Sequence, residues 1–175
     1  MAYIIWGFAI AVGLVAGWID WRSHRLPNWL TVPSCFIGIA LNTVIFKWAG
    51  LRDSLLGAVI ALAILFPIVL LRGLGAGDWK LMGALGAIVG KGEILNLLLA
   101  TILFAGLIAI VQIVRKRRVL VTLRNMWELV RGFFIFGLKP NAEISLDNAA
   151  ASTLPFGVAA AAATVLCLGA ILAGI

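Results

Sequence analysis

Charged side chains are scarce in this sequence. Asp, Glu, Lys and Arg make up 12% of its 175 residues, whereas soluble domains carry about 25%. Hydrophobic residues reach 63%, above the roughly 45–50% of soluble domains. This balance excludes an ordinary soluble domain and predicts an integral membrane protein built mostly of helices. We expect a single membrane domain over residues 1–175, without room for a sizeable soluble domain.

Cysteine and histidine are also scarce. Cys35 and Cys167 both fall in apolar stretches, so we expect small buried side chains and no disulfide. His24, the only histidine, is expected in an exposed loop, and no metal or other cofactor is expected. The net charge of +7 could suggest a nucleic-acid partner. We expect none, because the basic residues flank apolar spans as membrane topology requires.

Apolar runs divide the chain into helices. They predict an all-α, polytopic membrane protein with six transmembrane helices and one cytoplasmic amphipathic helix. The expected spans cover about residues 3–20, 29–48, 55–71, 78–90, 94–114 and 154–175, and the amphipathic segment covers about 119–137. The first run lacks the basic region and cleavage site of a signal peptide. A loop is expected at Leu51-Arg52-Asp53-Ser54, between the second and third spans.

The fourth run is too short to cross a bilayer by itself. Spanning takes about 20 residues for a hydrocarbon core of ~30 Å, and this run ends at Gly90. Its helix therefore either begins inside the membrane at the turn Gly75-Ala76-Gly77 or is re-entrant. In both cases Asp78 would face a water-accessible cavity, because an ionised group against lipid is costly.

Basic residues predict the orientation of the spans. With six spans and the amino terminus outside, eleven basic residues lie in inside loops and three in outside loops, as the positive-inside rule prefers. This orientation puts Asp20, at the end of the first span, on the same cytoplasmic side as Asp78. The inside set is Arg22, Arg25, Arg72, Lys80, Arg115, Lys116, Arg117, Arg118, Arg124, Arg131 and Lys139, and the outside set is Lys47, Arg52 and Lys91.

Asp20 and Asp78 are the candidate catalytic residues. Two carboxyl groups that share a proton can hydrolyse an amide bond, because the ionised one draws a proton from water while the protonated one donates to the carbonyl oxygen. Neither a metal nor a covalent intermediate is needed. Asp78 lies at a predicted helix start, which favours its ionised form and the role of base. The alternative is that both are interfacial residues, with Asp20 paired to Arg22 and Asp78 to Lys80.

Glycines next to Asp78 and a proline at the start of the last span are further candidate site residues. Gly75 and Gly77 permit a close approach of the backbone, which the presentation of an extended peptide bond requires, although a plain tight loop would also use them. Pro155 and Phe156 open the last span, where a proline leaves one backbone carbonyl unpaired and can shape a rim. The alternative there is an ordinary helix N-terminus with proline in its first turn.

Three motifs occur in order along the chain. The first is Asp20-Trp21-Arg22 followed by Leu26-Pro27-Asn28-Trp29-Leu30-Thr31, the second is Gly75-Ala76-Gly77-Asp78-Trp79-Lys80-Leu81, and the third is Leu154-Pro155-Phe156-Gly157. Together they resemble the type IV prepilin peptidase family, which are membrane aspartic proteases of the Gly-x-Gly-Asp type. The resemblance runs from Asp20 to Gly157, which is nearly the whole chain.

This resemblance implies an aspartic endopeptidase with Asp20 and Asp78 as its catalytic dyad. The residues expected to bind the substrate or shape the site are Gly75, Gly77, Lys80, Pro155 and Phe156. The substrate would be a prepilin with a short basic leader, cleaved after a glycine at the cytoplasmic face of the inner membrane. Membrane lipids are the other expected partner, because the basic amphipathic segment favours contact with anionic lipids. The oligomeric state is left open.

The chain departs from the long form of that family. Only eight residues separate Asp20 from Trp29, and there is no Cys-x-x-Cys, whereas the long form carries a cysteine-containing insert linked to N-methylation. The resemblance therefore implies a short, peptidase-only form, associated with Flp-type pilus systems, without methyltransferase activity. The same core also resembles archaeal preflagellin peptidases.

Two other classes of function stay open. A small transporter or proton-coupled carrier could use the same two carboxylates as a relay. Inverted repeats would favour that class, and the sequence shows none. A non-catalytic pilus assembly protein is the third class. Loss of prepilin cleavage on replacing either aspartate would distinguish the enzyme from both.

Overall fold

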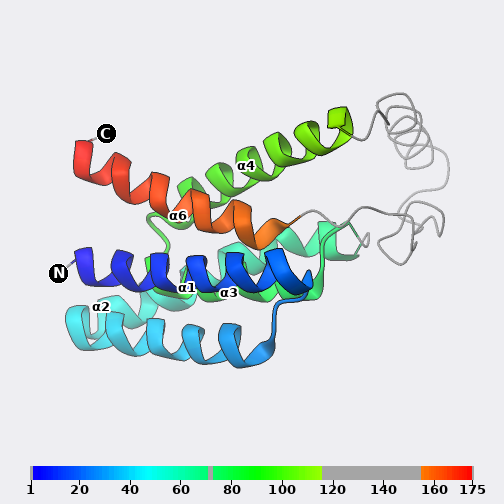
Figure 1. The fold of residues 1–175 in the computed structure, drawn as a ribbon. Coiled ribbons are helices and arrows are strands. Elements are labelled where there is room, and N and C mark those ends of the chain that lie inside the picture. The colour runs from blue at the N-terminus through cyan, green and yellow to red at the C-terminus, as the bar shows by residue number, and fades with distance from the viewer. Residues whose placement is uncertain (1, 71–72, 116–154, 175) are drawn as a thin grey trace.

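The computed structural model describes residues 2–70, 73–115 and 155–174, which form helices joined by short connections (Figure 1). The helices are α1 (Ala2–Ser23), α2 (Asn28–Leu70), α3 (Ala76–Val89), α4 (Ile94–Arg115) and α6 (Phe156–Ala173). The expected all-α class is therefore confirmed for the described residues. The amphipathic helix expected at about 119–137 lies outside them.

Four helices, α1, α2, α4 and α6, are long and apolar enough to cross a membrane. By the length and composition of its helices, the chain is a polytopic membrane protein. The expected count of six spans is not confirmed. α3 has 14 residues and reaches only about 21 Å at 1.5 Å per residue, short of a core of ~30 Å.

α2 reverses direction at Lys47, where the backbone has φ 55 and ψ −135. Figure 1 shows its first half and its second half running in opposite directions. The reversal can be this tight because residue 50 is a glycine. A Cβ at Gly50 would lie 2.0 Å from the Asn42 carbonyl oxygen. The expected loop at residues 51–54 is therefore wrong, since these residues are helical and the break falls before them. Asp53 and Ser54 suggested a loop, but their side chains bind Lys91 and the Ala87 carbonyl instead.

α3 lies at the centre of the bundle. Every residue from Leu81 to Ile88 is buried. Its backbone contacts α2 at two glycines, because a Cβ on Gly57 would lie 2.2 Å from the Gly86 carbonyl oxygen and one on Gly86 would lie 2.4 Å from that of Gly57. Only glycine allows two helices in a membrane to approach this closely.

Two buried polar side chains of α2 fix the C-terminal end of α3. The last four carbonyls of a helix lack partners within the helix. Asn42 Nδ2 lies 2.8 Å from the Ile88 carbonyl oxygen and 3.2 Å from that of Ala87, and the Ser54 hydroxyl also donates to Ala87. Asn42 and Ser54 are hydrogen bonded to each other at 3.0 Å. This network holds both halves of α2 and the end of α3 together.

The N-terminal end of α3 is set back inside the bundle. α3 runs antiparallel to the second half of α2, and Trp79 Nε1 donates to the Leu62 carbonyl at 2.8 Å. From Leu62, α2 continues to Leu70, eight residues or about 12 Å further. α3 begins only three residues before Trp79. Its first turn therefore lies below the level at which α2 ends.

α1 and α6 pack against each other through small residues. A Cβ on Gly17 would lie 3.1 Å from Ala161 Cβ, and one on Gly13 would lie 2.9 Å from Thr164 Oγ1. Small residues at such a contact let the two backbones approach. This close approach brings the N-terminus of α6 to the last turn of α1.

α4 is buried only along its first half. Its buried residues all precede residue 102, and none of residues 102–115 is buried. Figure 1 shows the second half of α4 leaning away from α6 as it approaches Arg115. Among residues 2–70, 73–115 and 155–174, none covers this side of the bundle next to the second half of α4.

Candidate active site

Asp20 lies in the last turn of α1 and is 4% exposed. The backbone N–H of Gly157 donates to its Oδ2 at 2.7 Å. Gly157 is the second residue of α6, where a backbone N–H has no partner within the helix, and the cap residue Pro155 supplies no side-chain acceptor. The carboxylate of Asp20, on α1, is the acceptor for this N–H of α6. The partial positive charge of a helix N-terminus favours a carboxylate there.

The identity of residue 157 makes this contact available. A Cβ on Gly157 would lie 2.8 Å from Asp20 Cβ and 3.0 Å from the Ala16 carbonyl oxygen. Any larger residue would push α6 away from α1. Gly157 is therefore a site-shaping residue that the sequence did not single out, although the third motif contains it.

Asp78 is the third residue of α3 and is partly buried. Its carboxyl group lies next to Gly75, which precedes the helix, because a Cβ built on Gly75 would lie 3.0 Å from Asp78 Oδ2. Gly77 contacts the loop between α1 and α2, because a Cβ there would lie 3.1 Å from Leu26 Cβ and 3.2 Å from its carbonyl oxygen. This contact ties the first turn of α3 to the loop that follows Asp20.

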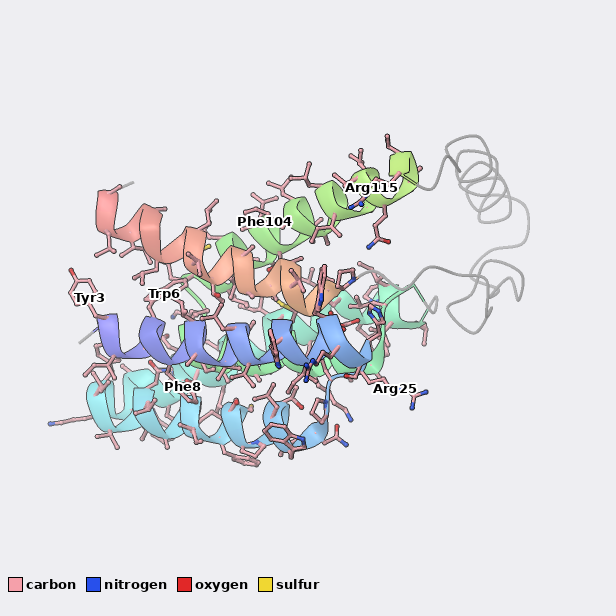
Figure 2. The ribbon with its side chains drawn as sticks, in the orientation of Figure 1. Tyr3, Trp6, Phe8, Arg25, Phe104 and Arg115 are labelled. Atoms are coloured by element: carbon pink, nitrogen blue, oxygen red, sulfur yellow. The ribbon has the colours of Figure 1, made fainter. Side chains whose placement is uncertain are left out.

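The two carboxylates line one cavity of about 460 Å³. Asp20 reaches it from α1 and Asp78 from α3. Figure 2 shows Arg25 and Arg115 at this end of the bundle, with Tyr3 at the opposite end. The other residues that line the cavity are His24, Leu65, Ile68, Gly73, Leu74, Gly75, Ile102, Ala105, Gly106, Ala109 and Phe156.

The basic residues next to each aspartate in the sequence have other partners. Lys80 Nζ is exposed and donates to Asn28 Oδ1 at 3.0 Å. Arg22 lies over the ring of Trp18, with its guanidinium carbon 5.2 Å from the ring centroid. The alternative of simple interfacial ion pairs for the two aspartates therefore finds no support in the described side chains. Lys80 lies outside the carboxylate cavity.

Only some of the remaining predicted site residues line the cavity. Gly75 and Phe156 line the cavity. Gly77 positions the first turn of α3, and Pro155 is the buried cap of α6 without being part of the cavity wall. His24 was expected to be an exposed loop residue. It is exposed, but it also lines the cavity. Its backbone N–H donates to the backbone carbonyl of Asp20 at 2.9 Å.

With this arrangement, the two carboxyl groups can act as acid and base on a polar group of a ligand that reaches their end of the apolar cavity. Two carboxyl groups in one site share a proton readily, because two negative charges so placed repel each other. Within residues 2–70, 73–115 and 155–174, no three His, Cys, Asp or Glu side chains gather as a metal site.

Comparison with known proteins gives a consistent result. Residues 7–110 match the model of the type IV leader peptidase family, and this range includes both aspartates. The chain is 34% identical over 112 residues to a prepilin leader peptidase/N-methyltransferase of Escherichia coli (strain K12), covering 60% of this chain and 49% of the relative. It is 32% identical over 94 residues to the protein of that name from Stutzerimonas stutzeri, covering 50% of this chain and 30% of the relative.

A relative of the same name from Burkholderia pseudomallei (strain K96243) is 36% identical over 91 residues, which cover 47% of this chain and 29% of the relative. The chain thus spans half the length or less of the curated relatives it matches. No solved structure matches it significantly.

Proposed function

Because this chain belongs to the type IV leader peptidase family, we propose that it is an aspartic endopeptidase that removes the leader peptide of type IV prepilins. The observation that carries the proposal is the shared cavity. Asp20 and Asp78 lie 58 residues apart in the sequence and on different helices, yet both line it. Two carboxyl groups are the full set of ionisable groups that hydrolysis by an aspartic dyad requires.

The reaction follows from how each carboxyl group is held. Asp20 accepts the Gly157 N–H at the N-terminus of α6, which favours its ionised form, so Asp20 is the base that takes a proton from water. The water oxygen bonds to the carbonyl carbon while Asp78, carrying the shared proton, donates it to the carbonyl oxygen. Collapse of this intermediate breaks the C–N bond: Asp20 gives the proton taken from water to the leaving nitrogen, and one hydroxyl proton of the intermediate returns to Asp78 as the C=O bond forms again. The sequence alone favoured Asp78 as the base, because it had no indication of the Gly157 contact.

Several finer features belong to the same proposal. Cleavage follows a glycine at the cytoplasmic face of the inner membrane, the amino terminus is outside, and the substrate is a Flp-type prepilin. The excess of basic residues in the loops on the carboxylate side supports this orientation. We also propose that the chain lacks methyltransferase activity, because residues 21–28 are too few for the insert expected of the long form and contain no Cys-x-x-Cys.

Co-expression with Flp-type prepilins tests this function. The chain and each prepilin are produced together in a host that lacks its own prepilin peptidase, and the mass of the prepilin is measured. The expected product lacks the residues up to and including the glycine and has an unmethylated amino terminus. Intact prepilins throughout the panel, with the chain present in the membrane, would contradict the proposal. A product heavier by one methyl group would contradict the peptidase-only form alone.

A further inference from the structure

The carboxylate cavity has one wall, on α4, that takes no part in the proposed chemistry. Ile102, Ala105, Gly106 and Ala109 line the cavity from this helix. Their spacing of i, i+3, i+4 and i+7 puts them on one face. We call these four residues the α4 wall. It carries no polar side chain, and three of its members are alanine or glycine.

The α4 wall is open to the surroundings of the bundle. Ile102 and Gly106 are exposed, and a Cβ on Gly106 would meet no atom within 4 Å. Across the cavity, Ile68 of α2 is also exposed. Exposed apolar residues thus border the cavity on both α2 and α4. Within the part of the chain that the structure describes, the cavity therefore opens sideways, at a level where the helices are apolar, and not only at the end of the bundle.

Among the residues that the structure describes, polar side chains occupy only one end of this cavity. The described ionisable residues that line it are Asp20, His24 and Asp78, whereas the α4 wall is apolar along about two turns of helix. A ligand that matches both parts must be apolar along most of its length and polar at one end. A transmembrane helix with the scissile peptide bond at its end has this distribution. The small residues of the wall leave room for such a helix, as they do at other helix contacts in membranes.

We propose that the α4 wall binds the apolar helix of a membrane-anchored substrate. The helix enters sideways between α2 and α4, and its polar end presents the peptide bond to Asp20 and Asp78. This inference rests on the proposed peptidase function and adds the surface that binds the substrate's helix. It also gives a reason for the exposed apolar face beside the carboxylates: the cavity must be reached from within the membrane.

A bulky side chain in the α4 wall tests the proposal. In Gly106→Leu the new side chain projects into open space, so the enzyme keeps its own packing while the substrate helix loses its place. Gly169→Leu in α6 is the matched control, because Gly169 also has no atom within 4 Å of a built Cβ and does not line the cavity. We expect Gly106→Leu to slow prepilin processing at least about tenfold, equivalent to a loss of 1.4 kcal/mol in binding, and Gly169→Leu to leave it unchanged. Processing by Gly106→Leu at the wild-type rate would overturn the proposal.

Cross-linking tests the same surface without catalysis. In an Asp78→Asn background with Cys35 and Cys167 replaced by alanine, cysteine is placed at Gly106 and, separately, at the exposed Leu107. A co-expressed Flp-type prepilin carries one cysteine in its apolar helix. We expect a disulfide to the prepilin from position 106 and little from position 107, which lies on another face of α4 and does not line the cavity. Equal yields at both positions, or a link from position 106 to a second copy of this chain instead, would overturn the proposal.

The two experiments separate this inference from the proposed function. If position 106 cross-links but the wild-type chain processes no prepilin, the proposed peptidase function is wrong and the proposed binding surface stands. If the wild-type chain processes prepilin but position 106 does not cross-link, the peptidase function stands and the binding surface is wrong.

Discussion

The carboxylate cavity is bounded by two unlike helices, α3 and α4. α3 is buried from Leu81 to Ile88, contacts α2 through its backbone and has its last carbonyls bound by Asn42 and Ser54. α4 has no buried residue after Thr101 and leans away from the bundle. Asp78 thus lies on a helix that is fixed by packing, whereas the second half of α4 is not buried among the described residues. The proposed peptidase needs both kinds of helix, because it must hold two carboxylates in place and still admit the helix of its substrate.

The largest effect on stability is expected where α3 meets α2. In Gly86→Leu, the new Cβ would lie 2.4 Å from the Gly57 carbonyl oxygen, so the two helices must separate. We expect a loss of at least about 3 kcal/mol in the free energy of unfolding, the upper end for overpacking. Thermal unfolding in detergent measures it, with Gly106→Leu on α4 as the control. Equal unfolding temperatures for these two variants would contradict the contrast between the helices.

A somewhat smaller effect is expected from the buried asparagine at the end of α3. Asn42→Ala leaves the Ala87 and Ile88 carbonyls without this donor in a buried place. We expect a loss of about 2 kcal/mol in stability, typical of a buried polar group left unpaired. The control is Asn96→Ala on α4, which removes an exposed contact to Glu93 and should cost less than about 0.5 kcal/mol. An unchanged unfolding temperature for Asn42→Ala would show that α3 is not held in this way.

Sequence patterns could predict that Asp20 and Asp78 come together at one end of the bundle, where both line the cavity. The distribution of basic residues over six expected spans put both on one side, and the short fourth run predicted a helix that either begins inside the membrane or is re-entrant. Lys47 could not be predicted as a break, because nothing in its side chain favours φ 55 and the polar residues 51–54 gave the stronger loop signal. The reversal depends on Gly50 packing against the Asn42 backbone, which is a tertiary contact.

Contacts between distant segments also limited the prediction of the site. Asp20 and Gly157 are 137 residues apart, and their hydrogen bond exists only because small residues let α1 and α6 approach. The third motif drew attention to Pro155 and Phe156, while the neighbouring glycine supplies the N–H. The α4 wall was missed because alanine and glycine in an apolar span carry no chemical signal of their own.

A moderate effect on activity is expected from Gly157→Ala, where α6 meets Asp20. The added methyl group would lie 2.8 Å from Asp20 Cβ, so α6 must shift and the N–H contact to the carboxylate weakens. We expect processing to slow about tenfold, which corresponds to 1.4 kcal/mol. Gly169→Ala, in the same helix but in open space, should process at the wild-type rate. If Gly157→Ala processes as fast as that control, the N–H contact does not position Asp20.

The smallest effect is expected from Lys80→Met. Lys80 lies on α3 but outside the cavity, and its exposed amine contacts Asn28. Loss of this contact should cost about 0.5 kcal/mol or less, as for exposed polar pairs, and leave processing within about twofold of wild type. A large loss of processing with normal stability would mean that Lys80 acts on the substrate or on Asp78. α3 would then contribute both Asp78 and Lys80 to the site.

The central claim is that Asp20 and Asp78 act together as the catalytic pair. Prepilin processing by Asp20→Asn, Asp78→Asn and Asp53→Asn, in membranes with matched protein levels, tests it most directly. Asp53→Asn is the control, because Asp53 is paired to Lys91 at 3.2 Å and does not line the cavity. The account predicts that each of the first two changes slows processing at least about a thousandfold, within the range for acid–base groups, while the third leaves it unchanged. Processing near the wild-type rate by either Asp20→Asn or Asp78→Asn would contradict it.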